Sequence, residues 1–317
     1  MLLLLKNRNF ILILAFVVGL FFPGLAYYTR SLTIPALALV MTVSLSDIAT
    51  KDMWQIKQLS KPFLLGILMN YCLLSSLFLL LTLLFIPDSS LRIGMIIVAA
   101  APPGVAIIPF SAILSGNILL SLFATFGAYL SAIIITPTLL ISLTETKNIP
   151  VLQLIFNLFY LIVLPIILSR ILQQKKILTL MRVWKGTIVN WGFFVVISTV
   201  IGLNQKNFFQ NYSNLVRISL VAFLTTFPLF YLLKFIFKKL GWKEKEAVSM
   251  TLLGTIKNSG FAAALAINLF DQEVSIPGAI ISAVYALYMI WLGNTGDGSL
   301  CDPSRRNIRY AQRNRKA

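Results

Sequence analysis

The sequence predicts an all-α integral membrane protein with ten transmembrane helices that form an inverted five-plus-five repeat, in which the fourth and ninth spans are discontinuous. Three features predict this fold: an apolar composition, a series of apolar runs of span length, and interruptions at matching places in the two halves. Of the 317 residues, 58% are hydrophobic and 12% are charged. A soluble domain has about 45–50% apolar and about 25% charged residues. The composition therefore excludes the water-soluble enzyme folds.

Apolar runs of span length follow one another along the chain. A helix needs about 20 mostly apolar residues to cross a hydrocarbon core. The ten runs that approach this length are 9–28, 31–46, 62–86, 92–115, 118–143, 150–172, 187–203, 215–237, 246–270 and 275–293. The first run follows two basic residues, as in a secretory signal, but it is long and no small-x-small cleavage site follows it. We therefore expect it to be retained as the first span.

The ten spans divide into two halves of five, so that 1–143 and 150–294 are the expected repeats. An odd number of spans in each half gives the two halves opposite orientations in the membrane. The remaining segment, 295–317, is polar and basic and has no apolar helical face. We expect this segment to be a mobile cytoplasmic tail.

The distribution of basic residues predicts the orientation. If the N-terminus is cytoplasmic, 21 of the 27 lysines and arginines lie in cytoplasmic segments. The positive-inside rule favours this orientation and rejects the inverse. The formal net charge of +17 is therefore explained by membrane topology, without a nucleic-acid partner. We expect a multi-pass protein of the inner or plasma membrane, in contact with the lipid bilayer, with both termini in the cytoplasm.

Two spans are interrupted at matching positions of the two halves. The fourth span contains Pro102, Pro103 and Gly104, and prolines in a helix interior remove amide donors and clash with the preceding turn. The ninth span contains Gly254 and the cluster Lys257-Asn258-Ser259-Gly260. A proline kink in a packed helix would explain either break alone. Paired breaks in register indicate the binding site of a transporter, because free backbone groups at this depth must face protein or a watery cavity.

Enzymatic and metal chemistry is not expected. Histidine is absent, and the two cysteines, Cys72 and Cys301, are far apart in unlike surroundings. The ten carboxylates all lie between or at the edges of the apolar runs. No nucleophile–base pair or metal-ligand cluster can be assembled from these residues, so we expect no enzyme, no metal and no cofactor.

The motifs at the two breaks carry a family resemblance. Pro-Pro-Gly is followed by Ser-Gly-Asn and a span rich in small and hydroxyl residues, and the ninth span reads Lys-Asn-Ser-Gly-x-Ala-Ala-Ala-Leu-Ala. This pattern resembles the bile acid:sodium symporter family of the bile/arsenite/riboflavin transporter superfamily. The resemblance implies that spans four and nine unwind and cross near the midplane. It also implies that a core bundle of spans three to five and eight to ten moves against a panel of the other four.

The positions that match sodium ligands of this family are largely replaced. Members that use sodium have a Ser-Asn pair where this chain has Ile107 and Ile108, and a glutamate and a glutamine where it has Leu253 and Lys257. Sodium is a hard cation that requires several oxygen ligands, and a fixed ammonium nearby repels it. The matching residues that are retained are Ser121, Thr125 and Asn70. We therefore expect that transport is not coupled to sodium.

Lys257 is the main candidate for a functional role at the site. A charged lysine at the centre of a bilayer costs about 2.5–3.5 kcal/mol on insertion scales, and such residues are functional by default. Three roles are open: it holds an anionic substrate, it exchanges a proton because burial disfavours its charged form, or its ammonium replaces sodium and fastens the crossing. Asn258 and Ser259 either bond the backbone of the break or reach the ligand.

These features predict a secondary transporter that moves a small organic anion by alternating access through the crossing of spans four and nine, with proton coupling as an option. The alternative within transport is a sodium-coupled, bile-acid-type organic anion symporter. The alternative from another class is a membrane sensor or assembly protein built on a transporter frame. The candidate substrate-binding or coupling residues are Lys257, Asn258, Ser259, Ser121, Thr125 and Asn70, and the helix-break residues are Pro102, Pro103, Gly104, Gly254 and Gly260.

Overall fold

Helices form the whole of the described structure apart from turns and one isolated β-bridge. The computed structural model describes residues 7–46, 56–144, 159–173, 175–206 and 212–295, together with Leu152, Gln153 and Phe156. No strand occurs among these residues. The all-α prediction is therefore confirmed, and the basic tail from 296 onward lies outside the described residues.

Six helical stretches of the described chain are long and apolar enough to cross a membrane. They are Pro23–Leu45, Ser60–Phe85, Ile118–Leu143, Trp184–Leu203, Tyr212–Lys239 and Gln272–Asn294. Shorter apolar helices occupy other predicted spans, namely Arg8–Phe21, Ser89–Ala100, Phe159–Ile171 and Ser259–Leu269. The chain is thus an integral, multi-pass membrane protein, and the count of ten spans stays a prediction.

Two predicted boundaries were wrong. The first predicted span reached residue 28, but α1 (Arg8–Phe21) ends earlier and Pro23 begins the next helix. Proline suits the first position of a helix because the amide that it lacks would be unpaired there. A single 3₁₀ turn then carries this helix on to Leu45.

The second wrong boundary concerns the connector predicted before span seven. The connector was expected to run from Gln173 to Gly186, but α12 (Lys175–Leu203) already begins within it. This stretch is composed of lysine, leucine, isoleucine and other residues of adequate helix propensity, without proline or an internal glycine before Gly186. The polar side chains of this stretch therefore did not indicate a loop, because the same residues are compatible with a helix.

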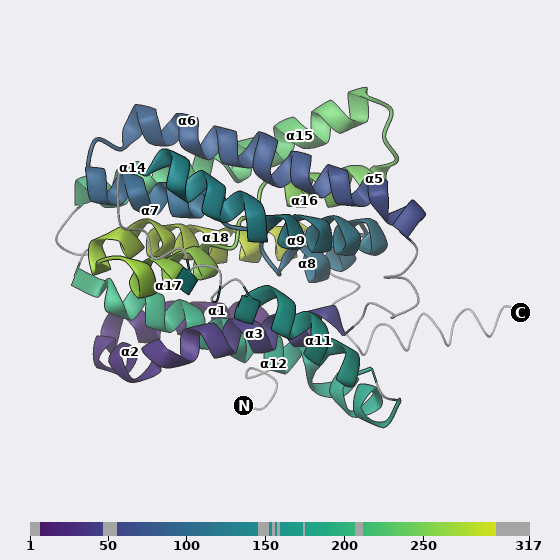
Figure 1. The fold of residues 1–317 in the computed structure, drawn as a ribbon, viewed down its shortest axis with the longest axis horizontal. Coiled ribbons are helices and arrows are strands. Elements are labelled where there is room, and N and C mark those ends of the chain that lie inside the picture. The colour runs from purple at the N-terminus through teal and green to yellow at the C-terminus, as the bar shows by residue number, and fades with distance from the viewer. Residues whose placement is uncertain are drawn as a thin grey trace, which may run out of the picture.

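The helices pack in two groups (Figure 1). The first group, which we call the panel, lies along the lower side of Figure 1 and consists of α1, α2 (Pro23–Thr29), α3 (Thr33–Leu45), α11 (Leu164–Ile171) and α12. The second group, which we call the core bundle, consists of α5 (Ile56–Ile67), α6 (Ser76–Phe85), α7 (Ser89–Ala100), α8 (Ile107–Ile113), α9 (Ile118–Leu143), α14 (Tyr212–Leu224), α15 (Phe227–Lys239), α16 (Glu244–Leu253), α17 (Ser259–Leu269) and α18 (Ile276–Thr295). Most helix contacts are made within a group, and α12 makes the main contacts from the panel to α17 and α18.

Glycines allow α5 and α9 to pack closely within the core bundle. A Cβ atom built on Gly66 would lie 2.0 Å from the carbonyl oxygen of Ala124, and one built on Gly127 would lie 2.5 Å from the Phe63 ring. Small residues at such contacts let helix backbones approach in membranes, where hydrophobic burial does not drive helix association. Position 66 therefore requires glycine, because the backbone of Ala124 leaves no space for a side chain.

We expect Gly66→Ala to lower the free energy of unfolding by about 1–3 kcal/mol, because the added methyl group forces α5 away from α9. The matched control is Gly24→Ala on α2, where no atom lies within 4 Å of the added Cβ. Thermal unfolding of both purified variants in the same detergent measures the difference. Equal melting temperatures would contradict the close packing of these helices.

Candidate functional site

The candidate site lies where two helices are broken in the core bundle. The first break separates α7 from α8, and the second separates α16 from α17. The first break falls at Pro102, Pro103 and Gly104, and the second runs from Gly254 to Asn258. Gly260 was predicted to belong to the second break, but it lies within α17 because Asn258 already caps that helix. Proline has no amide hydrogen to continue the helical bonding pattern, which explains the first break. Each of these two helices is therefore interrupted between its two segments.

The two unwound segments pair with each other through an antiparallel bridge between Pro103 and Lys257. The amide of Gly104 donates to the carbonyl of Ile256 at 3.0 Å, and the amide of Asn258 donates to the carbonyl of Pro102 at 2.9 Å. A Cβ atom on Gly104 would lie 2.7 Å from the Ile256 side chain, so glycine permits this approach. Each unwound segment thus supplies backbone hydrogen-bond partners to the other at a depth where water is absent.

The Lys257 side chain is anchored inside the core bundle. The residue is 1% exposed. Its Nζ donates to the carbonyls of Ala99 at 2.7 Å and Ala101 at 2.9 Å, and to Ser75 Oγ at 2.8 Å. The ammonium also lies 4.8 Å from the centre of the Tyr71 ring. Its three hydrogens therefore all have acceptors, and the two carbonyls belong to the C-terminal end of α7, where the helix dipole favours a cation.

A π-helical segment, η3 (Leu68–Ser75), supplies the hydroxyl that accepts from Lys257. Such segments are rare and often occur at functional sites. Ser75 Oγ also lies 2.6 Å from the Ala99 carbonyl, and Asn70 Nδ2 donates to the Ala101 carbonyl at 3.3 Å. The sequence interpretation missed Ser75 and Tyr71, because the five-residue turn of this segment breaks the helical spacing that would have aligned them.

Asn258 and Ser259 connect the second break to its surroundings. The Asn258 side-chain oxygen accepts from the amide of Phe261 and caps α17, while its Nδ2 donates to the Tyr129 hydroxyl at 3.0 Å. Ser259 Oγ accepts from Ser282 Oγ at 3.0 Å. The amide of Lys257 donates to the Tyr285 hydroxyl at 3.2 Å, a contact that the sequence did not predict.

The hydroxyl residues predicted on α9 lie apart from the lysine. Ser121 Oγ pairs with Ser111 Oγ of α8 at 2.5 Å. Thr125 is buried, and its hydroxyl has no hydrogen-bond partner within the described part of the chain. The same holds for Asn70 Oδ1 and Thr251 Oγ1. The structure thus brings Asn70 and Asn258 to the crossing with Lys257, and leaves Ser121 and Thr125 outside its hydrogen bonds.

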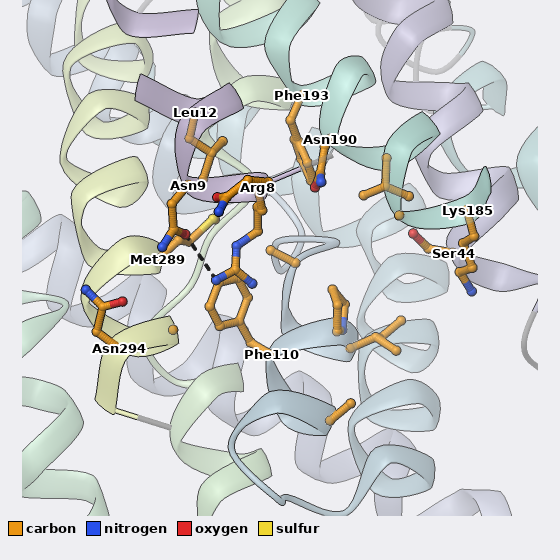
Figure 2. Close-up of a pocket in the computed structure, with 18 of the residues that line it drawn as sticks. Arg8, Asn9, Leu12, Ser44, Phe110, Lys185, Asn190, Phe193, Met289 and Asn294 are labelled. Carbon is orange, nitrogen blue, oxygen red and sulfur yellow. Dashed lines mark hydrogen bonds between the residues drawn. The ribbon is translucent and has the colours of Figure 1, made fainter. Parts of the chain in front are cut away.

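A cavity of about 740 Å³ lies between the panel and the core bundle (Figure 2). Its lining includes Arg8, Phe110, Lys185, Asn190 and Asn294. A smaller cavity of about 40 Å³ beside the crossing is lined in part by the second break. The residues that line both cavities are Leu12, Ala106, Phe193 and Met289. The two cavities therefore adjoin each other, the smaller one on the side of the crossing.

The acceptors of the Lys257 ammonium lie outside both cavities. Lys257 contributes to the lining of the smaller cavity, but the groups that surround its Nζ line neither cavity. Those groups are Ser75, Ala99, Ala101 and Tyr71. The Lys257 ammonium thus lies on the side of the unwound segment that faces η3 and the end of α7.

Two comparisons with known proteins bear on this site. The model of the SBF-like CPA transporter family matches residues 9–290. A protein of Bacillus subtilis (strain 168), named "Uncharacterized sodium-dependent transporter YocS", is 27% identical to the chain over 286 residues, which cover 86% of this chain and 84% of that protein. The matched family region includes both breaks and nearly all residues that line the two cavities.

We expect Lys257→Met to lower the free energy of unfolding, because it removes three hydrogen bonds from the ammonium to buried acceptors, and hydrogen bonds to charged groups contribute about 1.5–3 kcal/mol each. The matched control is Lys245→Met, since Lys245 is an exposed lysine on α16, the helix that ends at the second break. Thermal unfolding in detergent compares the two variants. A melting temperature equal to that of the control would show that the ammonium does not fasten the crossing.

Proposed function

The chain belongs to the SBF-like CPA transporter family, and on that premise we propose that it is a secondary transporter that moves a small organic anion by alternating access. The observation that carries this proposal is the crossing, where two broken helices pair by backbone hydrogen bonds and enclose a lysine ammonium. Membrane proteins tolerate unwound backbone only where it is buried in protein or lines a cavity, and transporters place their sites there.

We also propose that residues 1–143 and 150–294 are two inverted repeats, with both termini in the cytoplasm. The matching positions of the two breaks support the repeat, and the excess of basic residues on one side supports the orientation. In this orientation the large cavity opens to the cytoplasm, because it lies at the ends where α1 begins and α18 finishes. The structure then corresponds to an inward-facing state.

The role that we propose for Lys257 is that of a resident cation. Three hydrogen bonds hold its positively charged ammonium between η3 and the end of α7, and none of the groups that accept them lines a cavity. A second cation close to it would be repelled at low dielectric. Transport should then proceed without sodium, and the charge that binds the substrate must come from other residues.

A second candidate function is a sodium-coupled symporter. The relative from Bacillus subtilis carries the word sodium-dependent in its name. In addition, the buried oxygens of Asn70, Thr125 and Thr251 have no hydrogen-bond partner in the ranges that the structure covers. Buried unsatisfied oxygens are unusual, and oxygen ligands are what a hard cation requires. These two observations make sodium dependence the principal alternative.

Alternating access is supported by the contrast between the two ends of the panel–core interface. The cavity separates the panel from the core at one end of α12 and α18. At the opposite end, polar groups connect them: Arg30 Nη2 donates to the carbonyl of Ile267 at 2.9 Å, and Asn204 Nδ2 donates to Ser275 Oγ at 3.1 Å. Movement of the core bundle against the panel would break these contacts and close the cavity.

Uptake into proteoliposomes tests the coupling. We expect accumulation of a labelled organic anion to change less than about twofold when external sodium is replaced by potassium, because the resident ammonium already supplies the cation. A change in the pH gradient should alter uptake if the lysine exchanges a proton. Strict sodium dependence would favour the second candidate, and the absence of uptake for every solute tested would favour a non-transporting membrane protein.

A reversible cross-link tests alternating access. In a Cys72→Ser, Cys301→Ser background, we expect the pair Asn204→Cys and Ser275→Cys to stop uptake on oxidation with diamide, because a disulfide holds the panel against the core at the closed end. Addition of dithiothreitol should restore uptake. The single variants treated identically serve as controls. Full uptake by the cross-linked protein would show that these contacts do not open during transport.

A further inference from the structure

Lysines gather where α15 ends and α16 begins, in the segment 234–245 that we call the basic corner. Its five lysines are Lys234, Lys238, Lys239, Lys243 and Lys245. All five side chains are exposed, and within the part of the chain that the structure describes no carboxylate forms an ion pair with any of them. Helix α15 lies on the side of the core bundle away from the panel (Figure 1), and none of these lysines lines either cavity. The basic corner is therefore separate from the candidate transport site.

The basic corner begins where a membrane span ends. The apolar stretch Tyr212–Lys239 is long enough to cross a membrane, and Lys239 is its last residue. The Nζ atom of Lys239 lies 4.9 Å from the centre of the Phe235 ring, one helical turn earlier. Lysine side chains at the ends of spans cover apolar surface with their methylene groups and keep the ammonium among the lipid headgroups. These contacts place the first lysines of the corner at the level of the headgroups.

Trp242 fixes the turn between the two helices. Its ring packs on Phe237 with the centroids 5.1 Å apart, and its amide donates to the Phe237 carbonyl at 3.0 Å. Gly241 precedes it with a φ of 73°, which glycine adopts without strain. Tryptophan is enriched at the interface between membrane and water. The turn therefore keeps Lys243 close to the end of α15 and at the same level of the membrane.

We propose that the basic corner binds the phosphate group of an anionic phospholipid. Clusters of about four to eight lysines or arginines next to a span attract anionic lipids, because each charge interacts with the negative surface of the membrane. Lysine binds phosphate as a compact point charge. This inference concerns a different surface from the cavities and does not depend on the proposed transport function.

The surface beside the lysines favours a lipid over a soluble phosphate compound. Four large apolar side chains of α15 are exposed there, namely Leu232, Phe235, Ile236 and Leu240. Residues four apart share a helix face, so Lys239 lies on the face of Phe235, while Lys234 and Lys238 occupy the adjoining face. A phospholipid can place an acyl chain along the apolar side chains and its phosphate at the ammonium groups. A soluble phosphate compound would use the charges alone.

Two carboxylates of the basic corner oppose the binding of an anion. Glu244 and Glu246 lie in the first turn of α16, where the helix dipole favours negative charge. Five lysines and two glutamates leave an excess of three positive charges over residues 234–245. Removal of a glutamate should therefore strengthen lipid binding, whereas removal of a lysine should weaken it.

Thermal unfolding in nanodiscs of phosphatidylcholine with increasing fractions of phosphatidylglycerol tests this site. We expect phosphatidylglycerol to raise the melting temperature of the unmodified protein, and added salt to reduce the effect. The triple variant Lys234→Gln, Lys238→Gln, Lys239→Gln should require a higher fraction of phosphatidylglycerol for half of the effect, by about fivefold for each lysine removed. In phosphatidylcholine alone it should melt with the unmodified protein, because the three side chains are exposed.

A matched pair of single variants separates this site from the general effect of charge. Lys234 lies five residues before the end of the span Tyr212–Lys239, and Arg217, which is also exposed, lies five residues after its start. Lys234→Gln should weaken the effect of phosphatidylglycerol, whereas Arg217→Gln should leave it unchanged. Lys234→Arg should retain the effect because it keeps the charge, and Glu244→Gln should lower the fraction of phosphatidylglycerol that is required.

Tryptophan fluorescence tests where the lipid binds. We expect brominated phosphatidylglycerol to quench the fluorescence more than brominated phosphatidylcholine does at the same fraction. Trp242→Phe should remove this difference, because Trp242 lies within the basic corner. A difference of the same size in Trp242→Phe would place the anionic lipid elsewhere and contradict the assignment.

Two outcomes of the unfolding experiment would also overturn the proposal. If phosphatidylglycerol does not stabilise the unmodified protein, or stabilises the triple variant as strongly as Arg217→Gln, the lysines only set the membrane topology. If glycerol phosphate added to nanodiscs of phosphatidylcholine produces the same lysine-dependent stabilisation, the basic corner binds a soluble phosphate compound and not a lipid.

Discussion

The structure depends on the requirement that backbone groups released by an unwound helix find partners where water is absent. Two helices of the core bundle are interrupted, and each interruption satisfies the other through hydrogen bonds between Gly104 and Ile256 and between Pro102 and Asn258. The carbonyls at the end of α7 are then satisfied by the Lys257 ammonium. Neither break could persist alone in this environment, which explains why they occur as a pair.

The structure places two positive charges in different surroundings. The Lys257 ammonium lies within the core bundle, and its hydrogen-bond acceptors line neither cavity. The Arg8 guanidinium lies in the large cavity between the panel and the core. A cation that holds the crossing together cannot also release a solute in each cycle without breaking the crossing. In the proposed transporter, Lys257 therefore stabilises the crossing and does not bind the solute.

Several residues of the site could be predicted because single side chains have local consequences. Two prolines break a helix wherever it lies, and a lysine in an apolar run requires buried acceptors, so the sequence could predict an interruption and a buried cation at these positions. The contribution of Ser75 was not predictable, because a π-helical turn alters the helical spacing. Arg8 was interpreted only as a topology signal, since its stacking on Phe110 joins residues that are 102 positions apart.

The sequence by itself determined that the chain is an all-α membrane protein, where its two helices break, and which buried charge must be accommodated. Composition and the chemistry of proline, glycine and lysine act within a few residues, so they can be read without coordinates. The tertiary structure alone decided the direction of the Lys257 side chain, the acceptors from η3 and α7, and the position of Arg8 in the cavity. These outcomes depend on how distant helices pack against one another, and no local pattern specifies that packing.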